Sequence, residues 1–87
     1  MQRTALVETL ISILERSVDK RFDKIEESMN LKSELGLDSI DMVSMAFGIQ
    51  VEFNIDLPSD ELRRIVLVGD VLDAIQARLP AGRNQAA

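Results

Sequence analysis

The residues best suited to do chemistry lie in one short segment, Leu35-Gly36-Leu37-Asp38-Ser39-Ile40, which is followed at once by Asp41. Gly36 permits a turn, Asp38 can cap a helix, and Asp41 stands three residues later, where a capping box places its second side chain. With Asp38 as the cap, the Ser39 hydroxyl points outward from the first helical position. The helix N-terminus would favour an anionic group there, although Asp38 and Asp41 work against it. Taken alone, the segment is also a common helix start.

The chain of 87 residues contains no cysteine and no histidine. Disulfides, thiolate metal sites and thiol nucleophiles are therefore excluded, and the most common general base and metal ligand is missing. Without an imidazole beside it, Ser39 is not expected to be a catalytic nucleophile, so we expect neither an enzyme nor a metal site. No segment reaches the ~18 apolar residues of a membrane span. We expect a cytoplasmic protein without stable membrane insertion.

The formal net charge of −5 is unevenly distributed along the chain. Residues 38–61 contain six acidic residues and no Lys or Arg, whereas the C-terminal part is basic. This acidic region surrounds the candidate serine. It would repel nucleic acid, and it would attract a partner that has a basic patch.

The spacing of apolar residues predicts four helices, over about residues 4–18, 39–53, 59–65 and 68–79. Thr4 is a candidate N-cap for the first helix, and Ser59 or Asp60 for the third. The long connection over residues 19–37 could contain a helical turn near residues 25–28, and it needs buried anchors. The candidate anchors are Phe22, Ile25, Met29, Leu31 and Leu35. We expect an all-α fold, a small irregular four-helix bundle over residues 1–80, with a flexible tail over residues 81–87.

The helix expected over residues 39–53 is apolar on two sides. One stripe consists of Met42, Met45, Ala46, Ile49 and Phe53. The other consists of Ile40, Val43, Phe47 and Val51. One apolar face is normally enough for the core of a small domain. The second stripe is therefore buried in a larger core, lines a cavity, or stays open as a partner site.

The sequence pattern as a whole resembles that of the acyl carrier protein family over roughly residues 31–79. The matching residues are Leu35-Gly36-x-Asp38-Ser39-Ile40-Asp41, Val43, Glu52-Phe53, Ile55, Leu57-Pro58, Val68, Leu72 and Ile75. The resemblance implies a four-helix fold and a 4'-phosphopantetheine arm, transferred from coenzyme A to Ser39 by a phosphopantetheinyl transferase. Acyl groups would be carried on this arm as thioesters. Asp38 would belong to the cofactor site.

The resemblance also implies that the helix beginning at Ser39 is the main recognition element for acyl-loading, ketosynthase or acyltransferase-type enzymes. The residues expected to contact partners are Ile40, Asp41, Val43, Ser44, Phe47, Val51 and Glu52. Fatty-acid carriers usually have several glutamates along this helix, whereas Ser44, Gln50 and Val51 occupy such positions here. Arg63 and Arg64 add positive charge on the short helix. We therefore expect a monomeric, specialised carrier for a dedicated fatty-acid, lipid or polyketide pathway.

Alternative functions remain open at this point. A peptidyl or aminoacyl carrier would use the same arm, whereas an unmodified helical interaction module would use the exposed stripe and leave Ser39 bare. Catalysis by Asp38, Ser39 and Asp41 is a more distant alternative. A further question is whether acyl chains enter the bundle, although a closed, well-packed core is the default. The residues that could line such a cavity are Ala46, Ile49, Leu57, Ile65, Val71 and Ile75.

Overall fold

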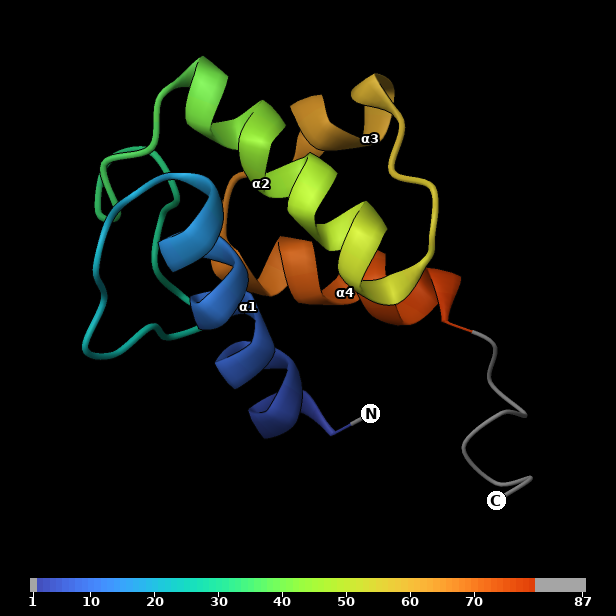
Figure 1. Ribbon diagram of the computed structural model, residues 1–87, viewed down its shortest axis with the longest axis horizontal. Helices are drawn as coiled ribbons and strands as arrows, with labels where there is room; N and C mark the ends of the chain where they lie inside the picture. Colours follow the sequence, from blue (N-terminus) through green and yellow to red (C-terminus); the bar gives the residue numbers. More distant parts are fainter. Residues whose placement is uncertain (1, 80–87) are drawn as a thin grey trace.

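The computed structural model describes residues 2–79, and within this range the chain forms four α-helices (Figure 1). They are α1 (Arg3–Ser17), α2 (Ser39–Phe53), α3 (Ser59–Arg64) and α4 (Val68–Arg78). The all-α prediction is confirmed, and each helix ends within about one residue of its expected position. The expected tail over residues 81–87 lies outside the described residues. None of the four helices is long and apolar enough to cross a bilayer.

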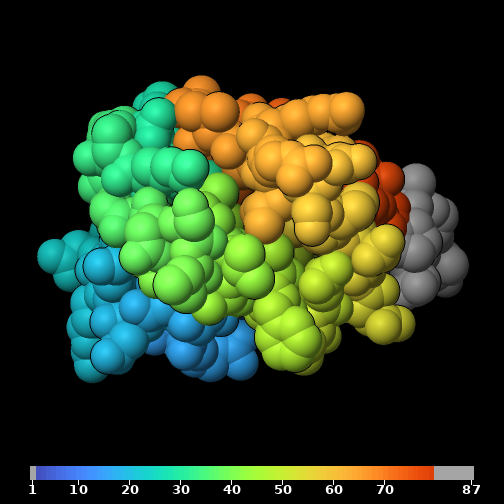
Figure 2. Space-filling model, turned by 90° about the horizontal axis from the view of Figure 1, so that it is seen from above, coloured from blue at the N-terminus to red at the C-terminus, as the bar shows by residue number. Residues whose placement is uncertain are grey.

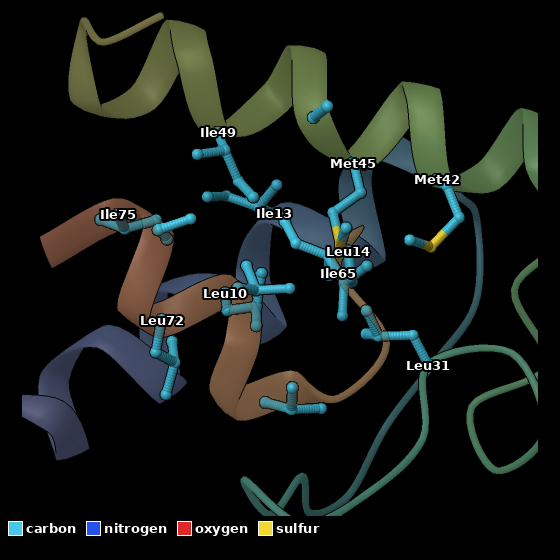
Figure 3. Close-up of a cluster of buried hydrophobic side chains, with 14 of the residues drawn as sticks. Leu10, Ile13, Leu14, Leu31, Met42, Met45, Ile49, Ile65, Leu72 and Ile75 are labelled. Carbon is cyan, nitrogen blue, oxygen red and sulfur yellow. The ribbon is translucent and has the colours of Figure 1, made fainter. Parts of the chain in front are cut away.

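The core lies where α1, α2 and α4 meet (Figure 3). Its side chains come from one face of each helix, as expected from their periodicity. They include Leu10, Ile13 and Leu14 of α1, Met45 and Ile49 of α2, and Leu72 and Ile75 of α4, all inaccessible to solvent. Burying one such side chain contributes roughly 1.5–3 kcal/mol relative to leaving it exposed. This packing fixes which side of α2 faces inward.

Gly48 allows α1 and α2 to approach closely. A Cβ atom at this position would lie 2.7 Å from Cγ2 of Ile13 and 2.7 Å from Oγ of Ser17. Glycine weakens a helix interior by about 1 kcal/mol relative to alanine. The close contact explains why a residue with this cost occurs in the middle of α2.

The connection between α1 and α2 is attached to the core by the expected anchors. Ile25, Leu31 and Leu35 are buried, and Phe22 and Met29 are partly buried against the core. The helical turn considered near residues 25–28 is a single turn only, in which the Met29 N–H donates to the carbonyl of Glu26 at 3.1 Å. The connection is therefore ordered by packing of its apolar residues and not by a helix.

Backbone hydrogen bonds join this connection to the start of α4. The Leu31 N–H donates to the Val66 carbonyl at 3.0 Å, and the Val68 N–H donates to the Met29 carbonyl at 2.9 Å. Between them, Asn30 and Leu67 form an isolated antiparallel bridge. These contacts hold the residues that precede α2 against the α3–α4 junction.

Two of the predicted helix caps are wrong. The N-cap of α1 is Gln2 and not Thr4, and the N-cap of α3 is Pro58 and not Ser59 or Asp60. Neither Gln2 nor Pro58 makes a side-chain cap hydrogen bond. In both helices the N-cap lies one or two residues before the polar residue that was predicted to cap the helix. A cap is worth only about 1 kcal/mol, so other contacts can set the helix start.

Charged side chains make contacts at the starts of α1 and α4. Arg3 at the beginning of α1 contacts Glu27 at 2.7 Å and Asp73 of α4 at 2.9 Å, and its hydrogen bond lowers the pKa of the Glu27 carboxyl. In the first turn of α4, the Asp70 carboxylate accepts hydrogen bonds from the N–H groups of Leu67 and Val66. These bonds lower the pKa of Asp70.

Candidate functional site

The segment before α2 is a turn whose geometry depends on one glycine. Gly36 has φ of +75°, in the left-handed region that glycine adopts without strain. The Leu37 N–H donates to the Leu31 carbonyl at 3.1 Å, and the side chains of Leu35 and Leu37 are buried. Because the leucines on both sides of Gly36 are anchored, the following residues emerge at the surface in a defined orientation.

Asp38 and Asp41 form the predicted capping box at the start of α2. The Asp41 N–H donates to Oδ1 of Asp38 at 2.8 Å, and the Asp38 N–H donates to Oδ2 of Asp41 at 3.2 Å. Ser39 is exposed between them, and its hydroxyl makes no hydrogen bond within residues 2–79. The predicted local geometry is thus confirmed, whereas the role of Ser39 stays a prediction.

The first turn of α2 can also accept an anion next to the serine. The backbone N–H groups of Ser39 and Ile40 donate to no acceptor in the described part of the chain. Free first-turn amides at the positive end of a helix dipole favour a negatively charged group. An exposed hydroxyl beside two unused donors therefore fits a phosphate ester on Ser39.

The cap can be tested separately from any attached group. We expect Asp38→Ala to lower the free energy of unfolding by about 1 kcal/mol, because it leaves the Asp41 N–H without its partner. Asp38→Asn retains a side-chain oxygen and should lose much less. Urea unfolding of the unmodified protein measures both variants. Equal losses in the two would show that the charge of Asp38, and not the cap hydrogen bond, is responsible.

A groove of about 470 Å³ lies next to Ser39. It is lined by Lys32, Ser39, Met42, Val43, Ser59, Leu62, Arg63 and Ile65. Figure 2 looks onto the face where the green start of α2 lies beside the gold residues of α3. Met42 and Ile65 are buried, whereas Lys32 and Arg63 are exposed. The groove can therefore hold a chain that is apolar in part and bears a negative charge near Ser39.

Sequence reasoning did not identify this groove. Its lining comes from the connection before α2, from the first turns of α2, and from α3 with the residue after it. Lys32 and Leu62 stand in no motif, and nothing in their spacing relates them to Ser39. Of the two cations in the groove, only Arg63 carried a signal in the sequence, as a positive charge on a short helix.

The two apolar stripes of α2 have different environments. In the first, Met42, Met45, Ala46 and Ile49 are buried and Phe53 is partly buried. In the second, the exposed fractions are 75% for Ile40, 61% for Val43, 67% for Phe47 and 66% for Val51. The second stripe is therefore not core. It is an apolar surface on the helix that begins at Ser39, and its contact with partners stays a prediction.

The polar residues predicted on the same surface are partly engaged within the chain. Asp41 is half-buried in the capping box, and Ser44 is half-buried. Glu52 pairs with Arg16 of α1 at 3.3 Å. On α3, Asp60 pairs with Arg63 at 2.6 Å. The acidic region seen in the sequence is thus partly neutralised, by Arg16 from α1 and by Arg63 on the same helix as Asp60.

The residues considered for an internal acyl cavity belong to the core. All six are buried within the same hydrophobic cluster, namely Ala46, Ile49, Leu57, Ile65, Val71 and Ile75. Of these, only Ile65 also lines the groove beside Ser39. The space next to the serine is therefore a surface groove, and the six residues pack against one another as in an ordinary interior.

Known sequences match most of this chain. Residues 4–75 match the family model described as a phosphopantetheine attachment site. An acyl carrier protein of Phenylobacterium zucineum is 33% identical over 76 residues, which cover 87% of this chain and 96% of that protein. One large component of a polyunsaturated fatty acid synthase from a Thraustochytrium species is 35% identical over 85 residues, which cover 95% of this chain but only 3% of that protein.

Solved structures agree with the sequence comparison. An acyl carrier protein from Thermotoga maritima matches with a TM-score of 0.83 and 26% identity, over 90% of this chain and 91% of that one. A putative acyl carrier protein from Mycobacterium tuberculosis matches with a TM-score of 0.75 over 83% of this chain and 96% of that one. At 22% identity, the second match shows the fold alone.

Proposed function

Because this chain belongs to the acyl carrier protein family, whose members carry a phosphopantetheine arm, we propose that Ser39 is the residue to which the arm is attached. One observation carries this proposal: the capping box of Asp38 and Asp41 leaves the Ser39 hydroxyl exposed and without a hydrogen bond in the described part of the chain. When bound, the arm supplies a thiol that holds an acyl group as a thioester.

The residues around Ser39 support attachment and not catalysis. The carboxylates of Asp38 and Asp41 each accept a backbone hydrogen bond, which holds them in the cap. A serine nucleophile requires a base within hydrogen-bond reach, and no hydrogen bond joins a base to the Ser39 hydroxyl among residues 2–79. We infer that the chain presents Ser39 to a phosphopantetheinyl transferase and leaves acyl chemistry to other proteins.

Acyl carrier proteins interact with synthase enzymes, and we propose that they bind this chain through the exposed stripe of α2. Ile40, Val43, Phe47 and Val51 form an apolar surface that no described residue covers. Contiguous exposed apolar side chains of this kind commonly mark protein-binding sites. Asp41, Ser44 and Glu52 lie on the same helix and would provide polar contacts around it. The partners we propose are acyl-loading, ketosynthase or acyltransferase-type enzymes.

We further propose that the chain serves a dedicated fatty-acid, lipid or polyketide pathway. The surface of α2 is more apolar and less acidic than is usual in fatty-acid carriers, because Val51 is exposed where an acidic residue often stands and Glu52 is paired with Arg16. The similarity of most of the chain to part of a polyunsaturated fatty acid synthase supports this proposal.

A direct test of attachment is the intact mass of the protein before and after incubation with coenzyme A and a broad-specificity phosphopantetheinyl transferase. We expect a gain of one phosphopantetheine. A folded protein that gains no mass with this transferase would instead support an unmodified helical interaction module.

The dedicated pathway is tested by the rate at which general fatty-acid ketosynthases and reductases use the loaded carrier. We expect these enzymes to use this carrier more slowly than their usual one. The apolar surface of α2 lacks the charges that steer association with a basic patch. Val51→Glu should increase the rate, and Ala77→Glu, on α4, is the control of equal charge. Use of the parent protein at the rate of the usual carrier would contradict a dedicated pathway.

A further inference from the structure

We propose that Lys32 and Arg63 hold the phosphodiester of the arm in the groove beside Ser39, so that the arm lies along the protein surface. This inference rests on the proposed attachment at Ser39. Lys32, Arg63 and Ser39 line the same groove, although they come from three separate segments of the chain. The proposal assigns a function to two exposed cations, of which only Arg63 forms an ion pair within residues 2–79.

The groove places both cations near the point of attachment. A phosphodiester on Ser39 begins at Oγ, so its charge must lie in the part of the groove that Ser39 lines. Lys32 has a flexible four-carbon stem, and Arg63 presents a planar group that matches phosphate oxygens. Both side chains are exposed, so neither is held elsewhere by packing. They can therefore turn toward a charge at Ser39.

The charges around Ser39 also require compensation. Asp38 and Asp41 lie one and two residues from Ser39, and a phosphodiester would add a third negative charge to the same helix turn. Lys32 forms no ion pair within residues 2–79. In the same range, Arg63 pairs only with Asp60 on its own helix, and an ion pair between two exposed side chains is worth little. Both cations are available to offset the added charge.

The remaining lining of the groove suits the rest of the arm. Beside the cations, the groove has the apolar residues Met42, Val43, Leu62 and Ile65. An arm held at its charged end can place aliphatic groups against these side chains, which removes apolar surface from water. The terminal thiol should then be partly shielded from reagents in solution.

The test measures the alkylation rate of the thiol in the modified protein with neutral iodoacetamide, together with the phosphorus NMR shift of the phosphodiester. In the variant Lys32→Gln/Arg63→Gln, we expect alkylation to accelerate roughly threefold to tenfold as the exposed charge pairs are lost. The phosphorus shift should move toward that of free coenzyme A. High salt should produce the same change in the parent protein and little change in the variant.

The matched control is Lys24→Gln/Arg64→Gln. This control also removes one lysine charge from the connection before α2 and one arginine charge from α3. Neither Lys24 nor Arg64 lines the groove. We expect its alkylation rate and phosphorus shift to match those of the parent. Far-UV circular dichroism confirms that each variant is folded, and intact mass confirms that each is modified.

The outcomes separate the two proposals. A parent protein that gains no phosphopantetheine would overturn the proposed attachment itself. A modified parent whose thiol reacts as fast as that of the Lys32→Gln/Arg63→Gln variant would overturn only the cation contact. If both double variants accelerate alkylation equally, the cause would be the change in net charge. The proposed contact of Lys32 and Arg63 with the phosphodiester would then be overturned.

Discussion

Replacing Ser39 with alanine is expected to abolish phosphopantetheine attachment and leave the fold intact. The Ser39 hydroxyl makes no hydrogen bond within residues 2–79, so its removal costs no protein contact. Alanine is also the better helix former. We therefore expect the free energy of unfolding to change by no more than about 0.5 kcal/mol. Intact mass after incubation with coenzyme A and the transferase should show no gain, whereas the parent gains one phosphopantetheine.

The control is Ser59→Ala, because Ser59 lines the same groove as Ser39. This variant should be modified as the parent is. If Ser39→Ala still gains the full mass, the attachment site lies elsewhere in the chain. If Ser39→Ala is unfolded, the absence of a mass gain means nothing, so the urea midpoint of each variant must be measured in parallel.

The second large effect should distinguish the two stripes of α2. Ile49 is fully buried and packs among side chains of α1 and α4 (Figure 3). We expect Ile49→Ala to lower the free energy of unfolding by about 2–5 kcal/mol, because it removes buried methyl groups and leaves a cavity. That is a large part of the ~5–15 kcal/mol that stabilises a typical domain. Urea unfolding of the unmodified protein measures the loss.

Val51→Ala is the matched substitution on the other stripe. Val51 is two residues from Ile49 but two-thirds exposed, so its truncation should change stability by no more than about 0.5 kcal/mol. It should instead weaken binding to a partner enzyme, which Ile49→Ala should not do where the protein remains folded. A strong loss of stability in Val51→Ala would show that the second stripe is buried in solution, for example against another copy.

The boundaries of α2 illustrate what local sequence can predict. Asp38 and Asp41 form a cap whose hydrogen bonds join residues three apart, so the start of the helix follows from the sequence alone. At its end, Asn54 adopts the left-handed conformation with φ of 54°, which asparagine tolerates better than most residues. Both signals act within one helix turn. Neither signal depends on a distant segment of the chain. This explains why the range predicted for α2 agrees with the structure.

The start of α1 shows where local signals fail. Thr4 is an acceptable cap by residue type, yet the helix begins at Arg3 with Gln2 as its N-cap. Arg3 contacts Glu27 and Asp73, which are far away in the sequence. A cap preference of about 1 kcal/mol is small enough for such contacts to outweigh. Sequence reasoning cannot weigh contacts between segments whose arrangement is unknown.

The sequence by itself determined the four helices, the aliphatic core and the exposed position of Ser39, because each depends on periodicity or on contacts within one turn. Only the tertiary structure decided which stripe of α2 is buried, since periodicity groups residues on a face but does not say what covers that face. It also decided that Arg16 pairs with Glu52 and that Lys32 and Arg63 share a groove with Ser39. These residues are brought together by chain packing, which depends on all of the helices at once.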